Sequence, residues 1–299
     1  MDGKGKLRID VGKAVSQFNK VVKEFKLRKT IYKTIFRGKG LEFDGYRYFD
    51  EALDDASMLD WKASLRANKL LAKKYIEERD LSIYFLFDSS SKMLFGSGNK
   101  LKAEYASEVV AALSYLIINS NDMPGLIMFS DKIRKFVRPS KSRYQFSLLV
   151  SSLSDASLYG GAFDMASAID VSLKKIKSEN PVVFLVSDFI SIRKGFEKDL
   201  KLMSTRFETI ALMIRDSFDD QLPNVNYQMS IQDPETGRQI LVDPSTVGKK
   251  YQQMALKQKT AVREMFEKTG VDLLELHTNE SFVVPLAAFL RARAERGKR

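Results

Sequence analysis

The chain has 299 residues, of which 44% are hydrophobic and 29% charged, the composition of a globular protein with a substantial core. It contains no cysteine, which excludes disulfides, thiolate metal sites and a cysteine nucleophile. The basic amino-terminal residues are not followed by an apolar run, and no apolar run reaches the ~20 residues that span a bilayer. We therefore expect a cytoplasmic protein without a transmembrane segment.

The net charge of +11 is concentrated at the two ends of the sequence. Residues 1–40 carry twelve Lys or Arg against three acids, and residues 291–299 carry five against one. The rest of the chain is therefore close to neutral. A nucleic-acid-binding protein usually concentrates positive charge on a folded face, so this distribution makes nucleic acid an unlikely partner. Binding of nucleic acid or anionic lipid through the basic amino-terminal region stays open as an alternative.

The first third of the chain contains two kinds of pattern. Residues 11–28 have apolar side chains near helical spacing and predict a basic N-terminal helix, so residues 1–28 form a first segment. Residues 29–79 contain glycines, alternating aromatic side chains and a later strand-like run, which predicts a β-rich accessory module.

Strands and helices alternate from about residue 80 to residue 299. The expected strands are 81–88, 124–130, 181–189, 209–214 and 271–277, with 132–139 as an antiparallel mate of the second. The expected helices are 101–119, 143–153, 164–177, 196–203, 249–268 and 284–295. Such alternation predicts an α/β fold, a doubly wound, mostly parallel, Rossmann-like sheet with helices on both faces. "IQDPETGRQILVD" predicts a β-hairpin inserted near residues 225–245.

Two of the expected strands end in an aspartate. "LSIYFLFDSSSKM" ends in Asp88, with Ser90 and Lys92 after it, and "PVVFLVSDF" ends in Asp188. Ligands of parallel α/β sheets bind outside the carboxyl ends of the strands, where both aspartates are expected. Carboxylates and a hydroxyl are ligands that Mg²⁺ prefers, so Asp88, Ser90 and Asp188 are the candidate metal ligands.

The Asp-x-Ser-x-Ser pattern, a glycine-rich loop and the later strand-end aspartate resemble the metal-ion-dependent adhesion site of von Willebrand factor A domains. Gly38–Ser64, together with "KKYIEERDLSIYFLFDSSSKM" and "IQDPETGRQILVD", is more specifically similar to an uncharacterised bacterial family encoded beside MoxR-type AAA+ ATPases. The resemblance spans about residues 28–290. It implies a von Willebrand factor A-like domain over residues 80–299 and a MoxR-type ATPase as partner.

Two positions depart from the adhesion-site pattern. Lys92 stands where the second serine is expected, and Ala162 follows Gly160-Gly161 where the family has a threonine. Losing two hydroxyls weakens a near-octahedral magnesium site, and an ammonium beside two carboxylates favours the charged forms of all three. We therefore expect Lys92 to replace the cation. The alternative is that Lys92 points into solvent and the site binds Mg²⁺ weakly.

Three other segments have alternative interpretations. Gly96–Lys100 lacks the spacing of a phosphate-binding loop and is expected to be a turn. His277 is the only histidine, but no Gly-x-Ser-x-Gly accompanies it, so a network role is favoured over catalysis. Asp54, Asp55 and Asp60 precede the only tryptophan, and we expect the acids to cap turns while Trp61 anchors a small core.

These patterns favour a protein-binding adaptor rather than an enzyme. The adaptor would dock through the degenerate site formed by Asp88, Ser90, Lys92, Ala162 and Asp188, with Lys92 offering a salt bridge to an acidic residue of the partner. Resemblance implies that the MoxR-type ATPase and the adaptor act in maturation or assembly of another complex. The alternative from another class is a divalent-metal-dependent binding protein or hydrolase that uses Asp88 and Asp188.

Overall fold

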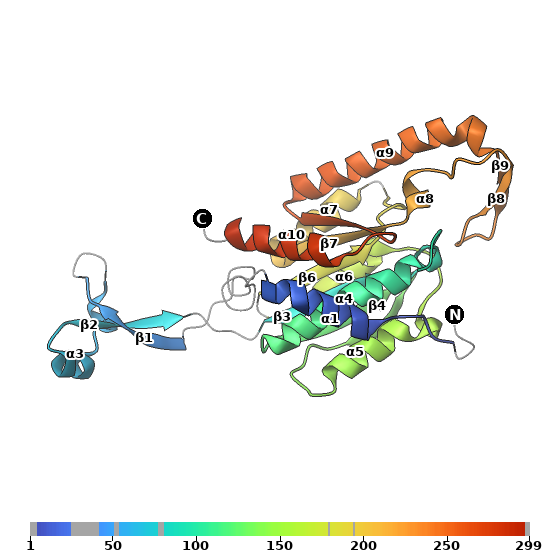
Figure 1. Ribbon diagram of the computed structural model, residues 1–299. Coiled ribbons are helices and arrows are strands. Elements are labelled where there is room, and N and C mark those ends of the chain that lie inside the picture. Colours follow the sequence, from blue (N-terminus) through green and yellow to red (C-terminus); the bar gives the residue numbers. More distant parts are fainter. Residues whose placement is uncertain are drawn as a thin grey trace. The chain divides into compact units, whose positions relative to one another are not determined.

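The computed structural model describes residues 5–24, 42–50, 54–76, 81–178, 180–193 and 195–296 (Figure 1). The chain divides into two compact units, one of residues 1–36 and 81–299 and the other of residues 37–80. The expected end of the first helix at residues 25–28 and the expected start of the accessory module lie outside the described residues, as do residues 77–80 of the charged run before the first buried strand.

The larger unit is built on a six-stranded sheet in the order β10-β7-β6-β3-β4-β5. All neighbouring strands are parallel except the pair β4–β5. The strands are β3 (Ser82–Asp88), β4 (Met123–Phe129), β5 (Ile133–Val137), β6 (Val182–Ser187), β7 (Glu208–Arg215) and β10 (Asp272–His277). Every residue of β3 and β6 is buried, which explains why their sequences are continuous apolar runs rather than alternating ones.

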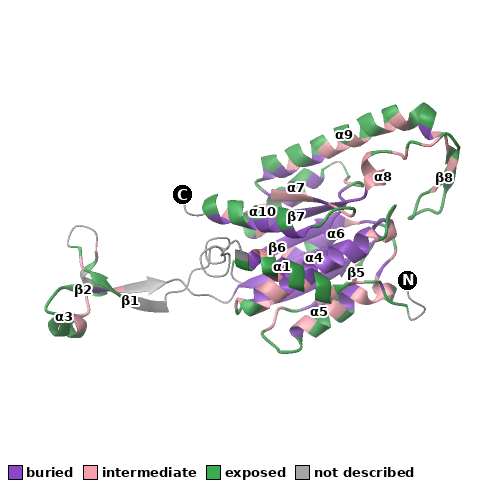
Figure 2. Ribbon diagram, viewed as in Figure 1, coloured by how far each residue is buried: buried purple, intermediate pink, exposed green. Residues whose placement is uncertain are grey.

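Helices cover both faces of this sheet, and Figure 2 shows the burial concentrated in the sheet and the helix surfaces against it. One core contains side chains of α1 (Val11–Glu24), α4 (Lys102–Asn119), α5 (Gln145–Ser154) and α10 (Val283–Arg296). The other contains side chains of α6 (Met165–Lys175), α7 (Phe196–Arg206) and α9 (Pro244–Thr269). The predicted doubly wound α/β fold is therefore confirmed. Among the described residues, no helix is long and apolar enough to cross a membrane.

The basic N-terminal helix is part of the larger unit. Phe18 and Val22 of α1 are buried in the first core, and α1 packs against α4 and α10. The apolar face predicted from the sequence thus lies on the sheet-covering helices, and lysines such as Lys13, Lys20 and Lys23 are exposed.

One short helix and a hairpin connect β7 to α9. Helix α8 (Ser217–Asp220) follows β7 directly. Strands β8 (Met229–Gln232) and β9 (Gln239–Val242) then pair with each other in an antiparallel two-stranded sheet, as predicted. Helix α9 ends at Gly270, which adopts the left-handed conformation that favours glycine.

The smaller unit contains an antiparallel pair, β1 (Glu42–Tyr48) and β2 (Leu71–Ile76), and the helix α3 (Trp61–Ala67). Asp60 accepts hydrogen bonds from the N–H groups of Lys62 and Ala63, and Asp55 from that of Ser57, so these acids cap turns as expected. The prediction that Trp61 anchors a core is wrong, because its side chain is 67% exposed. As the first residue of a seven-residue helix, Trp61 faces solvent.

Candidate functional site

The candidate site lies at the carboxyl edge of the sheet, between its two central strands. β3 and β6 are neighbours, but the helix after β3 (α4) covers one face and the helix after β6 (α7) covers the other. This is the topological switch point at which open α/β sheets bind their ligands. Asp88 is the last residue of β3, and Asp188 follows the last residue of β6.

Asp88 is fully buried and has three partners. The backbone N–H of Ser90 donates to its Oδ1 at 2.9 Å, and the hydroxyl of Ser187 donates to its Oδ2 at 2.6 Å. The ammonium of Lys92 lies 3.3 Å from Oδ2. The two strand ends are therefore joined through this carboxylate.

Asp188 is also fully buried, and each of its carboxylate oxygens contacts an ammonium. Lys92 Nζ lies 2.6 Å from Oδ1, and Lys102 Nζ lies 2.8 Å from Oδ2. Lys102 is the first residue of α4, and its side chain is 2% exposed. The charge opposite Asp188 is thus carried by two lysines, one of which the sequence patterns did not single out.

Lys102 extends the cluster to α8. Its Nζ lies 3.2 Å from Oδ2 of Asp219, a side chain that is itself 9% exposed. Three carboxylates and two ammonium groups therefore form one buried network. A buried ion pair needs such complementary partners, because removing each charge from water costs on the order of several kcal/mol.

The pKa values of this network follow from burial and charge. Burial acts to raise the pKa of Asp188, but the charges of Lys92 and Lys102 outweigh it and the pKa is lowered. Burial acts to lower the pKa of Lys102, but Asp188 and Asp219 outweigh it and the pKa is raised. Burial raises the pKa of Asp219, and its single lysine partner does not cancel that effect. Asp188 and Lys102 are therefore held in their charged forms.

Phe163 covers Lys92 from the side of the glycine-rich loop. The Lys92 ammonium lies 3.4 Å from the centroid of the Phe163 ring, a cation–π contact. Gly160 and Gly161 both have positive φ values, which allow the loop to turn here, and the carbonyl of Gly161 accepts from the N–H of Ser91 at 2.9 Å.

The oxygen atoms at this site are not arranged to coordinate a divalent cation. Both oxygens of Asp188 contact ammonium groups, and Ala162 supplies only an exposed methyl group. The Ser90 hydroxyl is buried without a hydrogen-bond partner among the described residues, which is the one feature expected of a vacated ligand position. One hydroxyl without a free carboxylate does not fit near-octahedral Mg²⁺.

The structure corrects one expectation about Lys92. We expected its ammonium to be offered to an acidic residue of a partner, yet the side chain is 8% exposed and lies between Asp88, Asp188 and the Phe163 ring. Its charge is neutralised within the protein. The alternative that Lys92 points into solvent is wrong for the same reason.

The two other candidates, Gly96–Lys100 and His277, make contacts with other groups. Gly96–Lys100 forms a turn in which the N–H of Ser97 donates to Oδ2 of Asp216 at 3.1 Å, so the turn binds a carboxylate of the chain itself. His277 Nε2 lies 3.0 Å from Oε1 of Glu275, in a network with Asp220 and Lys259. Among the described residues the recorded partners of His277 are acids, not a serine hydroxyl.

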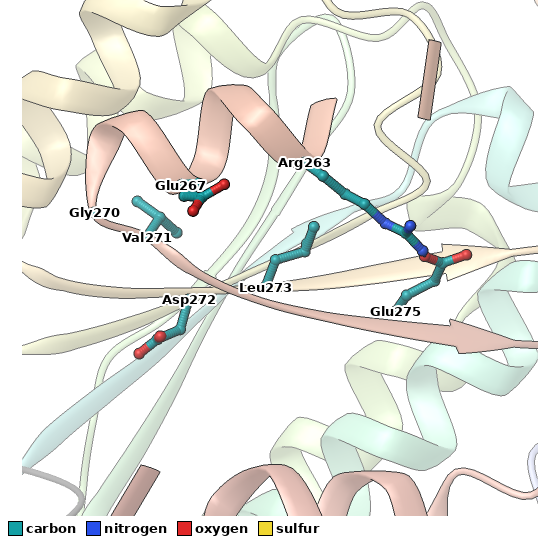
Figure 3. Close-up of a pocket in the computed structure, with 7 residues that line it drawn as sticks. All are labelled: Arg263, Glu267, Gly270, Val271, Asp272, Leu273 and Glu275. Carbon is teal, nitrogen blue, oxygen red and sulfur yellow. The ribbon is translucent and has the colours of Figure 1, made fainter. Parts of the chain in front are cut away.

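A surface hollow of about 460 Å³ lies beside β10, lined by Arg263, Glu267, Gly270, Val271, Asp272, Leu273 and Glu275 (Figure 3). It borders the start of the strand, and Arg263 extends across it to Glu275. The hollow contains none of the residues of the Asp188 network, so we do not assign it to this site.

The sequence patterns missed three members of the site. Lys102 is the first residue of α4, and Asp219 lies in the four-residue helix α8. Phe163 lies in the glycine-rich loop. The only signal for Lys102 was a lysine in the first helical turn, where the helix dipole disfavours a cation. Such a residue needs a carboxylate partner to compensate.

One protein family matches most of the chain. The family described as "Protein of unknown function DUF58" matches residues 46–261, well over half of the sequence. The chain belongs to this family. Two relatives are 24% identical over 245 residues, 80% of this chain and 76% of each relative. They are the "Uncharacterized protein Rv1480" of Mycobacterium tuberculosis and the "Uncharacterized protein Mb1516" of Mycobacterium bovis.

Solved structures with some likeness include the conserved hypothetical protein BatB from Bacteroides thetaiotaomicron. It is 13% identical with a TM-score of 0.46, over 72% of this chain and 99% of that one. The SpRpn10 VWA domain is 10% identical with a TM-score of 0.39, over 72% and 95% of the two chains.

Proposed function

We propose that this DUF58-family chain is a protein-binding adaptor, not an enzyme, and that it docks a partner at the carboxyl edge of its sheet. The observation that carries the proposal is the pairing of Asp188 with both Lys92 and Lys102. Two ammonium groups supply the charge of a divalent cation and join β3, α4 and β6 without one. An edge stabilised in this way needs no metal to be rigid. Its described carboxylates Asp88, Asp188 and Asp219 are all paired with ammonium groups, which leaves none of the three free for acid–base or metal chemistry.

The surface over this network suits a protein partner. Ala162 and Ile190 are exposed on the two loops that border it. A hollow of about 210 Å³ is lined by the apolar side chains of Phe163, Met165 and Phe196, with the charged residues Asp164, Arg193 and Asp199 also in its lining. This is below the roughly 300–1,000 Å³ of small-molecule sites, so the hollow suits one apolar side chain of a partner.

The partner we propose is a MoxR-type AAA+ ATPase. The support is the sequence resemblance to the group encoded beside such ATPases, together with the likeness of the fold to interaction domains of the von Willebrand factor A type. The pair would act in maturation or assembly of another complex.

The test is a binding titration with a purified MoxR-type AAA+ ATPase. Ala162→Arg places a long charged side chain on the docking edge and should weaken binding at least about tenfold, the effect of losing about 1.4 kcal/mol. Leu202→Arg is the matched control, because Leu202 is an exposed residue in the second half of α7. Equal affinity of the Ala162→Arg variant and the wild type would contradict docking at this edge.

A further inference from the structure

The β8–β9 hairpin is held by few contacts. Among the strands that the structure describes, these two pair only with each other, and the residues from 233 to 241 are all exposed. Ile240 and Leu241 point to opposite faces of the ribbon, yet they are 60% and 69% exposed. Figure 1 shows the hairpin beyond the amino-terminal end of α9. A two-stranded hairpin without a core is marginally stable in water, so single contacts at its tip determine where it lies.

One such contact joins the hairpin tip to the glycine-rich loop of the site. Oε1 of Glu235 accepts a hydrogen bond from the backbone N–H of Phe163 at 3.0 Å. The neighbouring N–H groups of this loop bond instead to the residues that follow β3 and β4: Gly160 donates to the Ser89 carbonyl at 2.8 Å, and Asp164 to the Ser130 carbonyl at 3.0 Å. The loop is therefore anchored on both sides of Phe163. The N–H of Phe163 is bonded to the hairpin, and its ring packs near Phe129 in the second core.

Phe163 is also the residue that shields Lys92. Its ring faces the ammonium at 3.4 Å, and this ring is the apolar side of an environment that is otherwise Asp88 and Asp188. If Phe163 moves, the ammonium gains access to solvent on that side while Asp188 stays within 2.6 Å on the other.

We propose that the β8–β9 hairpin is a strap that closes the docking edge, with Glu235 holding Phe163 over Lys92. In the closed state Lys92 is buried and the edge presents Ala162 and Ile190. Release of Glu235 lets Phe163 move and opens the side of Lys92 that the ring covers. This inference rests on the proposed docking function and adds its regulation: the hairpin must be drawn away before the charged part of the site binds.

The experiment measures how fast each lysine is acetylated by a brief treatment with an N-hydroxysuccinimide acetate, read by mass spectrometry and normalised to the exposed Lys249. Glu235→Ala removes the strap contact at an exposed side chain and should leave the fold intact. Glu197→Ala, at an exposed acid in the first turn of α7, is the matched control. Phe163→Leu tests the shield directly.

We expect Glu235→Ala to raise the acetylation rate of Lys92 about fivefold, the scale of losing one hydrogen bond of ordinary strength. Amide hydrogen exchange in a peptide covering residues 159–166 should rise with it, and Glu197→Ala should change neither. An unchanged Lys92 rate in Glu235→Ala overturns the strap. If Phe163→Leu raises that rate and Glu235→Ala does not, the strap is also overturned. Docking at the edge is tested separately, by the Ala162→Arg titration.

Discussion

Lys102 Nζ lies 2.8 Å from Oδ2 of Asp188, on the opposite oxygen from the one that Lys92 contacts. The two lysines come from different elements, the short helix after β3 and the start of α4. A divalent cation at this edge would need the same carboxylate, so the two arrangements exclude each other. Lys92 and Lys102 supply the positive charge that a divalent cation would otherwise supply opposite Asp188.

Replacing Asp188 by Asn should destabilise the protein strongly. The change leaves two buried ammonium groups without their shared carboxylate, and breaking a buried ion pair from one side costs about 3 kcal/mol or more. We expect a correspondingly lower midpoint in urea unfolding followed by far-UV circular dichroism.

Asp170→Asn is the control for that loss, because Asp170 pairs with Lys174 on the exposed surface of α6. Its midpoint should stay close to that of the wild type, since exposed pairs contribute little. Equal midpoints for Asp188→Asn and Asp170→Asn would show that the Asp188 network does not stabilise the fold.

Millimolar Mg²⁺ or Mn²⁺ should not raise the thermal midpoint of the wild type beyond the effect of KCl at the same ionic strength. A ligand that binds the native state raises the midpoint, and here both oxygens of Asp188 are already engaged. The double variant Lys92→Ser/Lys102→Ala frees them and restores a hydroxyl, so its midpoint should rise with either metal.

The control for the metal experiment adds Asp188→Asn to the double variant, which should abolish its response. A metal-dependent rise in the wild type itself would refute the metal-free site. It would favour the alternative in which Asp88 and Asp188 bind a divalent metal.

The strands of the central sheet that the sequence predicted most directly are those with a continuous apolar run. β3 and β6 are continuous apolar runs that end in aspartate, and such runs occur in strands buried on both faces. The helix α3 has only seven residues, too few turns for its periodicity to be distinguished from a bent strand. Lys102 and Asp219 are 117 positions apart, and only the folding of the chain brings the start of α4 and α8 close enough for their charges to meet.

The stability contributed by His277 should depend on pH. Its hydrogen bond to Glu275 raises its pKa above the ordinary value of about 6.5, with Asp220 adding to the effect and Lys259 opposing it. A raised pKa in the folded state stabilises the protein below the unfolded-state pKa, and this contribution is lost as pH rises through the folded-state pKa.

The free energy of unfolding of the wild type should therefore exceed that of His277→Gln by more at pH 6 than at about pH 8.5, the range in which a histidine with a raised pKa titrates. Glu275→Gln removes the partner that raises the pKa and should flatten the dependence. A difference between wild type and His277→Gln that is constant across this range would contradict the assignment.

Gly161→Ala should destabilise the loop that borders the docking edge. Gly161 has a φ of +85°, and an added Cβ would lie 2.5 Å from Nη2 of Arg134 and 2.6 Å from Oδ1 of Asp131. The side chains of these two neighbours can shift, but the positive φ remains strained for alanine, so we expect a loss of about 1 kcal/mol or more. Gly248→Ala is the matched control, because Gly248 lies inside α9 with open space around its Cβ position and should gain up to about 1 kcal/mol. Urea unfolding of both variants checks the opposite signs, and a neutral Gly161→Ala would mean that the loop conformation places no demand on glycine there.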